Sequence, residues 1–447
     1  MAERPQQMLQ GSLLRFVRRG AWARARKLLE KSHPADIAEV FERLTEPDRQ
    51  ALFDLIESAR TRAEVVTLRE FAGGARLLAG LDYGAAARIL EHVSPDDAAL
   101  LLRELPRDQT DEILGCLGDD ALEVEKLLGY AEDTAGAIMS PEFFALPETL
   151  TSKEAIEQLQ SHGSSEASFY VYVVDERDHL VGVLSLRQLI LPPPYTVLRD
   201  FMVSDPISVS ADTDQEEVAR VVARYDLLAV PVADTAGRLV GVVTVDDVID
   251  VLREEATEDL LKLAGTTVEE VNSPGAFRGA WIRFPWLAAS FVGGGFGVLL
   301  LDLFEPTLLA TVQMAFFLPI ILGMGGNIAS QCSMVVVRGL ATGRLELGSI
   351  GRIVGHEIGT SIILAVAFAL ALGLVAVWLG YQPQRFPLVV AAGMFTSMLV
   401  AAILGTVLPL VFTRFGVDPA VASGPFVTTS TDIVGILGFF GVASALL

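Results

Sequence analysis

The chain has 447 residues, which is too many for one ordinary domain, and its 56 acidic and 34 basic residues give a net charge of −22. Residues 271–447 hold seven bases and six acids, a net charge of +1, so the first 270 residues hold the other 27 bases and 50 acids, a net charge of −23. An acidic half of this kind disfavours nucleic acid as a partner and favours divalent cations. The two cysteines, Cys116 and Cys332, are far apart in the sequence and predict neither a disulfide framework nor a zinc site.

Apolar residues recur at helical spacing in the first part of the chain, for example at Ile37 and Phe41. Ser94 is expected to cap a helix that has Pro95 in its first turn and acids near the positive end of its dipole. Other segments open in the same way, with a proline followed by an acid. The pattern predicts an all-α, superhelical N-terminal domain of stacked helical hairpins over residues 1–130.

Residues 131–252 contain an internal repeat. Ile-Met-Ser-Pro-Glu at 138–142 is echoed by Phe-Met-Val-Ser-Asp-Pro at 201–206, and Leu-Val-Gly-Val-Leu-Ser at 180–185 is echoed by Leu-Val-Gly-Val-Val-Thr at 239–244. A helix and alternating apolar strands between the motifs predict two copies of a β-α-β-β-α unit. This α/β repeat resembles a tandem pair of CBS domains.

An acidic amphipathic helix is predicted from Val248 to Leu263, and we assign residues 253–275 to a connecting segment that carries most of it. The helix runs from the repeat toward the first apolar span. Its acids are candidates for a plug that responds to cations.

Five apolar segments follow, and each can supply the roughly 20 residues that a bilayer span needs. They lie at about 284–301, 308–337, 353–380, 387–412 and 421–446. Six bases flank the spans on the N-terminal side of the membrane, and only Arg385 lies in the opposite loops: Arg278, Arg283, Arg338, Arg344, Arg352 and Arg414. This bias predicts a five-helix transmembrane domain over 276–447, with the N-terminal half in the cytoplasm and the C-terminus outside.

Asp432 is a lone carboxylate near the end of this apolar region. An ionised Asp at membrane depth costs about 2.5–3.5 kcal/mol on insertion scales, so such residues usually line a wet cavity or an ion path. Neighbouring hydroxyls, among them Thr428 and Thr431, and the following Gly435 favour a hydrated, pore-lining surface. The alternative is an Asp that only caps a helix starting there.

The second span carries Pro319 and a cluster of glycines, followed by Asn327. Proline and glycine loosen a helix, and carbonyls freed there can face a wet cavity but not lipid. Gly325, Gly326 and Asn327 are therefore candidates to line a pore. Close helix packing through small residues explains the same pattern equally well.

The complete arrangement resembles the MgtE family of bacterial magnesium channels. The run 323–331 resembles that family's Gly-Met-Gly-Gly-Asn…Gln motif, and the run 425–432 resembles its pore-helix motif. The sequence departs from the family at Ala329, where a glycine is expected. The resemblance implies a homodimer in the bacterial inner membrane that imports Mg²⁺ down the membrane potential, with Asp432 holding the ion in the pore.

Magnesium gives up its water reluctantly, so one carboxylate per chain among hydroxyls and carbonyls suits a hydrated ion. A two-fold dimer would bring two copies of Asp432 to the axis.

The resemblance also implies a gate in which cytosolic acids bind Mg²⁺ and close the pore when its concentration is high. The candidate regulatory ligands are Asp96, Asp97, Asp214, Glu216, Asp226, Asp246, Asp247, Asp250, Glu255, Glu258, Asp259 and Asp418. For each of them, a solvated helix face is an equally good explanation. Thr244 and Asp247 also resemble the CBS pattern that contacts a nucleotide ribose, which suggests at most one ATP site per chain.

Two other readings stay open, and a third is disfavoured. The transported ion could be another divalent cation, such as Co²⁺, Ni²⁺ or Mn²⁺. The chain could instead be a membrane-anchored nucleotide sensor. His356-Glu357 resembles the opening of a zinc-protease His-Glu-x-x-His motif, but Thr360 stands where the second histidine belongs, so we do not expect an enzyme.

Overall fold

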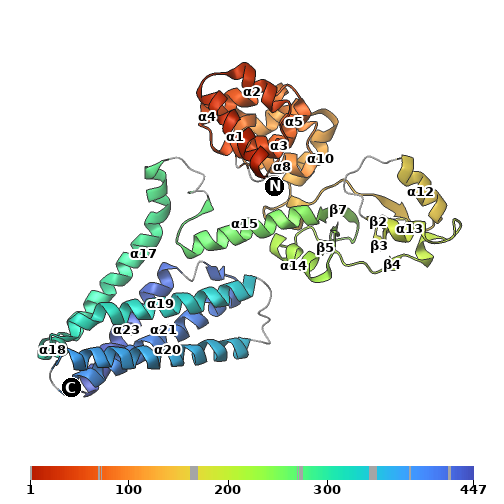
Figure 1. Ribbon diagram of the computed structural model, residues 1–447. Helices are drawn as coiled ribbons and strands as arrows, with labels where there is room; N and C mark the ends of the chain where they lie inside the picture. The colour runs from red at the N-terminus through yellow and green to blue at the C-terminus, as the bar shows by residue number, and fades with distance from the viewer. Residues whose placement is uncertain are drawn as a thin grey trace. The chain divides into compact units, whose positions relative to one another are not determined.

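The computed structural model describes residues 3–68, 71, 73–161, 170–268, 270, 275–341, 350–381, 384–420 and 424–446. The chain divides into two compact units, Met1–Arg253 and Glu254–Leu447 (Figure 1). Each unit has its own hydrophobic core, and we describe the two separately.

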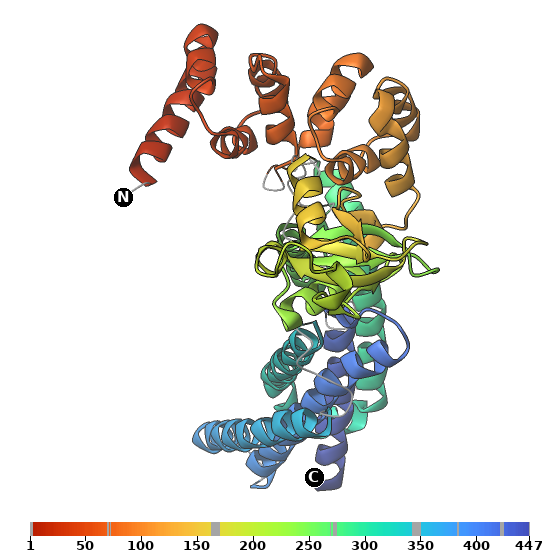
Figure 2. The same ribbon diagram turned by 90° about the vertical axis from the view of Figure 1, so that its right-hand side faces the viewer.

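The first unit begins with short helices, most of them six to ten residues long. They are α1 (Glu3–Arg18), α2 (Trp22–Leu29), α3 (Pro34–Glu42), α4 (Glu46–Phe53), α5 (Ala59–Val66), α6 (Gly74–Ala79), α7 (Tyr83–Leu90), α8 (Pro95–Arg103), α9 (Arg107–Leu114) and α10 (Ala121–Leu128). Each odd-numbered helix packs on the next odd-numbered one, from α1 to α9, so that the hairpins stack side by side (Figure 2). The predicted superhelical, all-α N-terminal domain is confirmed.

Aromatic residues fill the middle of this stack. Phe41 lies edge-on to both Phe53 and Phe71, with ring centroids 6.4 and 5.6 Å apart. The expected cap at Ser94 is only half right. Ser94 occupies the N-cap position of α8 with Pro95 in the first turn, but its hydroxyl makes no capping bond to the helix backbone.

The repeat forms two small sheets. The first has the order β1 (Ala145–Pro147), β2 (Tyr170–Val174), β3 (Leu180–Ser185) and β4 (Val203–Ser204), and the second has the order β5 (Val209–Ser210), β6 (Ala229–Ala233) and β7 (Leu239–Thr244). In both sheets a parallel pair precedes an antiparallel hairpin whose register shifts once, between Val173 and Val174 and between Val232 and Ala233. The remaining helical elements of this region are α11 (Ala135–Ile138), α12 (Ser152–Ser161), α13 (Leu186–Ile190), η2 (Leu198–Asp200) and α14 (Gln215–Tyr225).

The two repeats exchange contacts, because the segment after each methionine pairs with the strand that carries the glycine of the other repeat. A Cβ added to Gly182 would lie 2.4 Å from the sulfur of Met202, and one added to Gly241 would lie 2.6 Å from the sulfur of Met139. The methionine of each repeat therefore fills the space left by the glycine of the other repeat. This explains why both repeats combine a methionine with a glycine between apolar strand residues.

Helix α15 (Val245–Leu263) starts three residues before the predicted acidic helix. It continues without a break through the boundary between the two units at Arg253.

Five helices of the second unit are long and apolar enough to cross a membrane. They are α17 (Ala276–Leu303), α19 (Met314–Ala341), α20 (Ile350–Trp378), α21 (Phe386–Arg414) and α23 (Pro425–Leu446). The predicted start of the second span at residue 308 is wrong. A separate short helix, α18 (Glu305–Ala310), has Pro306 in its first turn and ends before Thr311, where the backbone leaves the helical conformation.

Helix α21 is the centre of this unit and packs against α19, α20 and α23 (Figure 1). The predicted loosening of the second span is not observed, because α19 is continuous through Pro319 and the glycines. Gly325 instead allows close packing, since an added Cβ would lie 3.0 Å from the hydroxyl of Ser397. Gly405 similarly accommodates the backbone of Ala329, whose carbonyl oxygen would lie 2.3 Å from an added Cβ.

Candidate permeation path and cation-binding residues

Asp432 lies in the second turn of α23, seven residues after the helix begins at Pro425. Its position inside the helix rules out the alternative of a helix cap. The side chain is half-buried within one chain. Thr428 precedes it by four residues, so the two side chains share one face of the helix about 6 Å apart along the axis.

The other predicted pore-lining residues divide into two groups. Thr428 and Asn327 are exposed within one chain and Gly326 is half-buried. The other group is buried inside the helix bundle: Gly325, Thr431 and Gly435. The Thr431 hydroxyl donates to the Thr428 carbonyl of its own helix at 2.8 Å, and Gly435 accommodates Leu322 and Ser397. Helix packing explains this buried group without a pore.

One face of α19, a helix apolar enough to cross a membrane, carries exposed side chains, three of which are polar. Asn327, Ser330, Gln331 and Met334 are all exposed and fall at helical spacing. Groups of this polarity do not face lipid when a protein surface or water can cover them.

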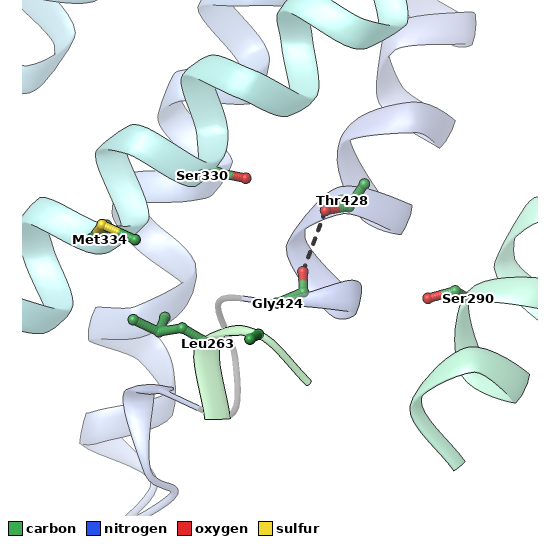
Figure 3. Close-up of a pocket in the computed structure, with 7 residues that line it drawn as sticks. Leu263, Ser290, Ser330, Met334, Gly424 and Thr428 are labelled. Atoms are coloured by element: carbon green, nitrogen blue, oxygen red, sulfur yellow. Dashed lines mark hydrogen bonds between the residues drawn. The ribbon is translucent and has the colours of Figure 1, made fainter. Parts of the chain in front are cut away.

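A cavity of about 320 Å³ lies beside this face (Figure 3). Its lining residues come from the end of α15 and from α17, α19 and α23: Leu263, Ala264, Ser290, Ser330, Met334, Gly424 and Thr428. The hydroxyls of Ser290, Ser330 and Thr428 point into the space between the three long helices, and that of Thr428 donates to the Gly424 carbonyl at 3.4 Å. Thr428 was predicted from the sequence, whereas Ser290 and Ser330 were missed. The one sequence feature that could have indicated these two serines is a hydroxyl group within an apolar span.

The end of α15 is held by a cation of the chain itself. Lys262 Nζ lies 2.5 Å from Glu258 Oε1 and 2.7 Å from Asp418 Oδ2. Burial opposes the charged form, but the hydrogen bonds to Asp418 and Glu258 outweigh it and raise the pKa of Lys262. Burial and the Asp418 charge raise the pKa of Asp259. All three acids are among the predicted metal ligands. Lys262 was not predicted, because an i, i+4 Glu–Lys pair is common on solvated helices.

A second ion pair lies between α15 and α17. Glu270 accepts hydrogen bonds from Arg283 Nε, at 2.6 Å, and from the hydroxyl of Thr266. The Arg283 guanidinium and the Thr266 hydroxyl together lower the pKa of Glu270. The segment that follows α15 is thereby tied to the start of the first span.

Several predicted regulatory acids in the first unit have structural roles. Asp214 caps α14 by accepting from the Glu216 backbone N–H at 2.9 Å, and Glu216 pairs with Arg220 at 2.5 Å. Asp226 ends the same helix in the left-handed conformation, with φ of 51°. Thr244 donates to Asp247 Oδ2 at 2.5 Å, so the two predicted nucleotide contacts are oriented together.

Asp96 is the exception among these acids. It is 6% exposed, and its Oδ1 has no hydrogen-bond partner. Burial, followed by the neighbouring charge of Asp97, raises the pKa of Asp96 to about 6, and Glu142 adds to the shift. A buried acid with an unpaired oxygen and acidic neighbours is a place where a cation would be favourable.

The remaining predicted acids stay on the surface or half-buried: Asp246, Asp250 and Glu255. Within the described ranges, no three His, Cys, Asp or Glu side chains come together in a way that could hold a metal. His356 is exposed beside Glu357, with 3.4 Å between Nδ1 and Oε1, and Thr360 supplies no further ligand for zinc.

Comparison with known proteins agrees with this arrangement. The family model for the MgtE intracellular N domain matches residues 32–133, the CBS domain model matches residues 135–191 and 198–254, and a divalent cation transporter model, MgtE, matches residues 318–442. These matches confirm the tandem CBS domains and the resemblance to the MgtE family.

Whole-length relatives are also found. The chain is 36% identical over 443 residues to the magnesium transporter MgtE of Thermus thermophilus, covering 98% of both chains, and 33% identical over 434 residues to that of Bacillus subtilis, covering 94% of both. A solved cytosolic domain of a Mg²⁺ channel MgtE in complex with ATP is 38% identical, with a TM-score of 0.50, and aligns with 54% of this chain and 99% of its own length. The protein, a multi-pass membrane protein with a soluble N-terminal half, belongs to the MgtE family of magnesium transporters.

Proposed function

We propose that the protein is a magnesium-selective channel that imports Mg²⁺ along a path lined by α19 and α23. The observation that carries the proposal is the position of Asp432, one helical turn beyond Thr428 on a face of α23 that lines the hydroxyl-bearing cavity. A carboxylate next to hydroxyls at membrane depth binds a cation while avoiding the cost of facing lipid. Hydrated magnesium fits such a site because its water molecules can bond to hydroxyls and carboxylate without being removed.

The driving force would be the membrane potential, which is worth about 2.3 kcal/mol per charge per 100 mV and roughly twice that for a divalent ion. The six bases that flank the spans on the N-terminal side support a cytoplasmic soluble half. Cytosolic acids would then sense the imported ion.

A homodimer would complete the path. Only 6% of the apolar window of α17 is buried in one chain, and the polar face of α19 is exposed. A two-fold partner would cover these surfaces and bring two copies of Asp432 together. Native mass spectrometry of the detergent-solubilised protein should give a species of twice 48.0 kDa. A species of one chain at all concentrations would contradict the dimer.

The pore assignment is tested by magnesium flux into proteoliposomes. We expect Asp432→Ala to lower uptake by at least about tenfold, because removing the only carboxylate of α23 removes the cation site. Asp302→Ala, at the exposed end of α17, is the matched control and should leave uptake unchanged. A variant that lacks all residues before α17 should keep its Mg²⁺ uptake and lose inhibition by internal Mg²⁺. Unchanged uptake in Asp432→Ala would overturn the pore assignment.

Asp96 is proposed to bind a regulatory ion, and its pH dependence tests this. Its native pKa of about 6 exceeds the unfolded value of 3.8, so the native state binds the proton more tightly and stability falls as pH rises between these values. Asp96→Asn should therefore stabilise the soluble half above pH 6, by up to about 3 kcal/mol without Mg²⁺, and have little effect below pH 4.

Thermal melting at pH 5 and pH 8 measures this difference, with Asp111→Asn on the exposed side of α9 as the control. Millimolar Mg²⁺ should stabilise the wild type more than Asp96→Asn. Equal stabilisation of both proteins by Mg²⁺ would remove Asp96 from the regulatory set.

The second CBS repeat is proposed to bind ATP through Thr244 and Asp247, which are already joined by a hydrogen bond. The ATP complex of a relative's cytosolic domain supports this proposal. Calorimetric titration should give an affinity at least about tenfold weaker for Asp247→Asn, since a charge-assisted hydrogen bond to ribose would be lost. Ser185→Ala, at the equivalent position of the first repeat, should bind ATP as the wild type does. Equal affinities for Asp247→Asn and wild type would refute the assignment.

Another divalent cation is the second candidate for the transported ion, because the matched family model is described only as a divalent cation transporter. Replacing Mg²⁺ by Co²⁺, Ni²⁺ or Mn²⁺ in the same flux assay separates these candidates. A membrane-anchored nucleotide sensor would give no flux of any of them.

A further inference from the structure

Lys262 is the only base on the last two turns of α15, and the other charged residues of this stretch are the carboxylates Glu258 and Asp259. The Lys262 ammonium lies between two carboxylates, Glu258 on its own helix and Asp418 on the segment between α21 and α23. Lys262 and Asp418 are 156 residues apart in the sequence, so their ion pair is a tertiary contact and not a local helix pair. The lysine side chain is 27% exposed, which shields the contact from much of the solvent.

The surrounding charges make the ammonium necessary. Asp259 also lies near Asp418, and burial together with that charge raises its pKa. Lys262 therefore contacts two carboxylates, Glu258 and Asp418, and the charge of Asp259 acts on the same region without a direct ion pair to the lysine. Without the lysine these carboxylates would repel each other, and the end of α15 would be pushed away from the Asp418 segment.

The contact also fixes the wall of the cavity. Lys262 is followed directly by Leu263 and Ala264, which line the cavity together with Gly424 and Thr428. The Leu263 carbonyl is so close to Gly424 that an added Cβ would lie 3.0 Å from it. Movement of Lys262 would therefore open or reshape the side of the cavity that α15 covers (Figure 3).

We propose that Lys262 is a positioning residue whose ammonium acts as a resident counter-ion, seating the end of α15 against the Asp418 segment when no divalent ion is bound. The dependence of the gate on magnesium then resides in the other acids, and this junction supplies a metal-independent part of closure. The Glu270–Arg283 pair adds a second anchor that needs no metal. Only the link from this contact to closure rests on the proposed function.

Hydrogen exchange of the full-length protein in EDTA tests the contact without any transported ion. In Lys262→Met the apolar stem is kept and the charge is lost, so we expect the amides of residues 259–266 to exchange about tenfold faster, as for loss of a partly buried ion pair. Lys262→Arg should restore most of the protection. Lys153→Met, which breaks an exposed i, i+4 pair with Glu157 in the other unit, is the matched control and should leave these amides unchanged.

Two further measurements decide the role. Asp418→Asn should raise exchange in the wild type but add little in Lys262→Met, because both changes remove the same contact. In proteoliposomes without internal Mg²⁺, Lys262→Met should raise uptake about threefold or more.

Unchanged exchange in EDTA would overturn the counter-ion itself. Faster exchange with unchanged uptake would leave the contact in place but refute its part in closure, and absence of all flux in the wild type would refute the proposed channel instead.

Discussion

The cost of placing a charge in hydrocarbon constrains the membrane unit more than any other interaction. Asp432 is the only ionisable residue of α23, and it lies in the second turn of that helix, beyond the Thr428 that lines the cavity. A carboxylate there is tolerated only where water, polar side chains or a cation replace its hydration. The exposed polar face of α19 obeys the same constraint, because Asn327 and Gln331 need a partner other than lipid. Both features favour a shared, hydrated surface on α19 and α23, which a second copy of the chain would enclose.

Small residues allow the helices to come close enough to build that surface. A Cβ added to Gly405 would overlap the Ala329 backbone, and one added to Gly325 would lie 3.0 Å from the Ser397 hydroxyl. Gly293 likewise accommodates Thr429 between α17 and α23. In a bilayer, where lipid tails are as apolar as the helices, close backbone approach is a main source of association energy. Gly325 of the second span thus serves packing, whereas Gly323 and Gly326 have no neighbouring atom within 4 Å of an added Cβ.

The acidic residues of the soluble half are under a weaker constraint, because water screens the charge of most of them. Asp214 and Glu216 are used for a helix cap and an ion pair, and such contacts stabilise the domain whether or not a metal is present. Asp96 is buried with an unpaired oxygen, so its surroundings favour a proton or a metal ion. At the end of α15, Lys262 pairs with Asp418, 156 residues away, so this acidic cluster is neutralised by a tertiary ion pair and not only by a local helix pair such as Glu216–Arg220. The acids therefore differ in their surroundings: some cap or pair within one helix, Asp96 is buried with an unpaired oxygen, and those at the end of α15 contact Lys262.

The sequence by itself determined the fold class, the CBS repeat, the five apolar spans and the family, because these depend on local composition, periodicity and motifs that are present in the linear sequence. It also singled out Asp432 as an isolated carboxylate, and the role of that residue in a pore stays a prediction. Tertiary structure alone decided which residues of those motifs face a cavity. Thr428 lines the cavity, whereas Thr431, three residues later, is buried against its own bundle. It also decided the partner of Asp418, a lysine 156 residues away, and the separate helix that precedes α19. Helix rotation and long-range ion pairing depend on packing between segments distant in sequence, and the spacing of residues along one helix does not encode which neighbour each face will meet.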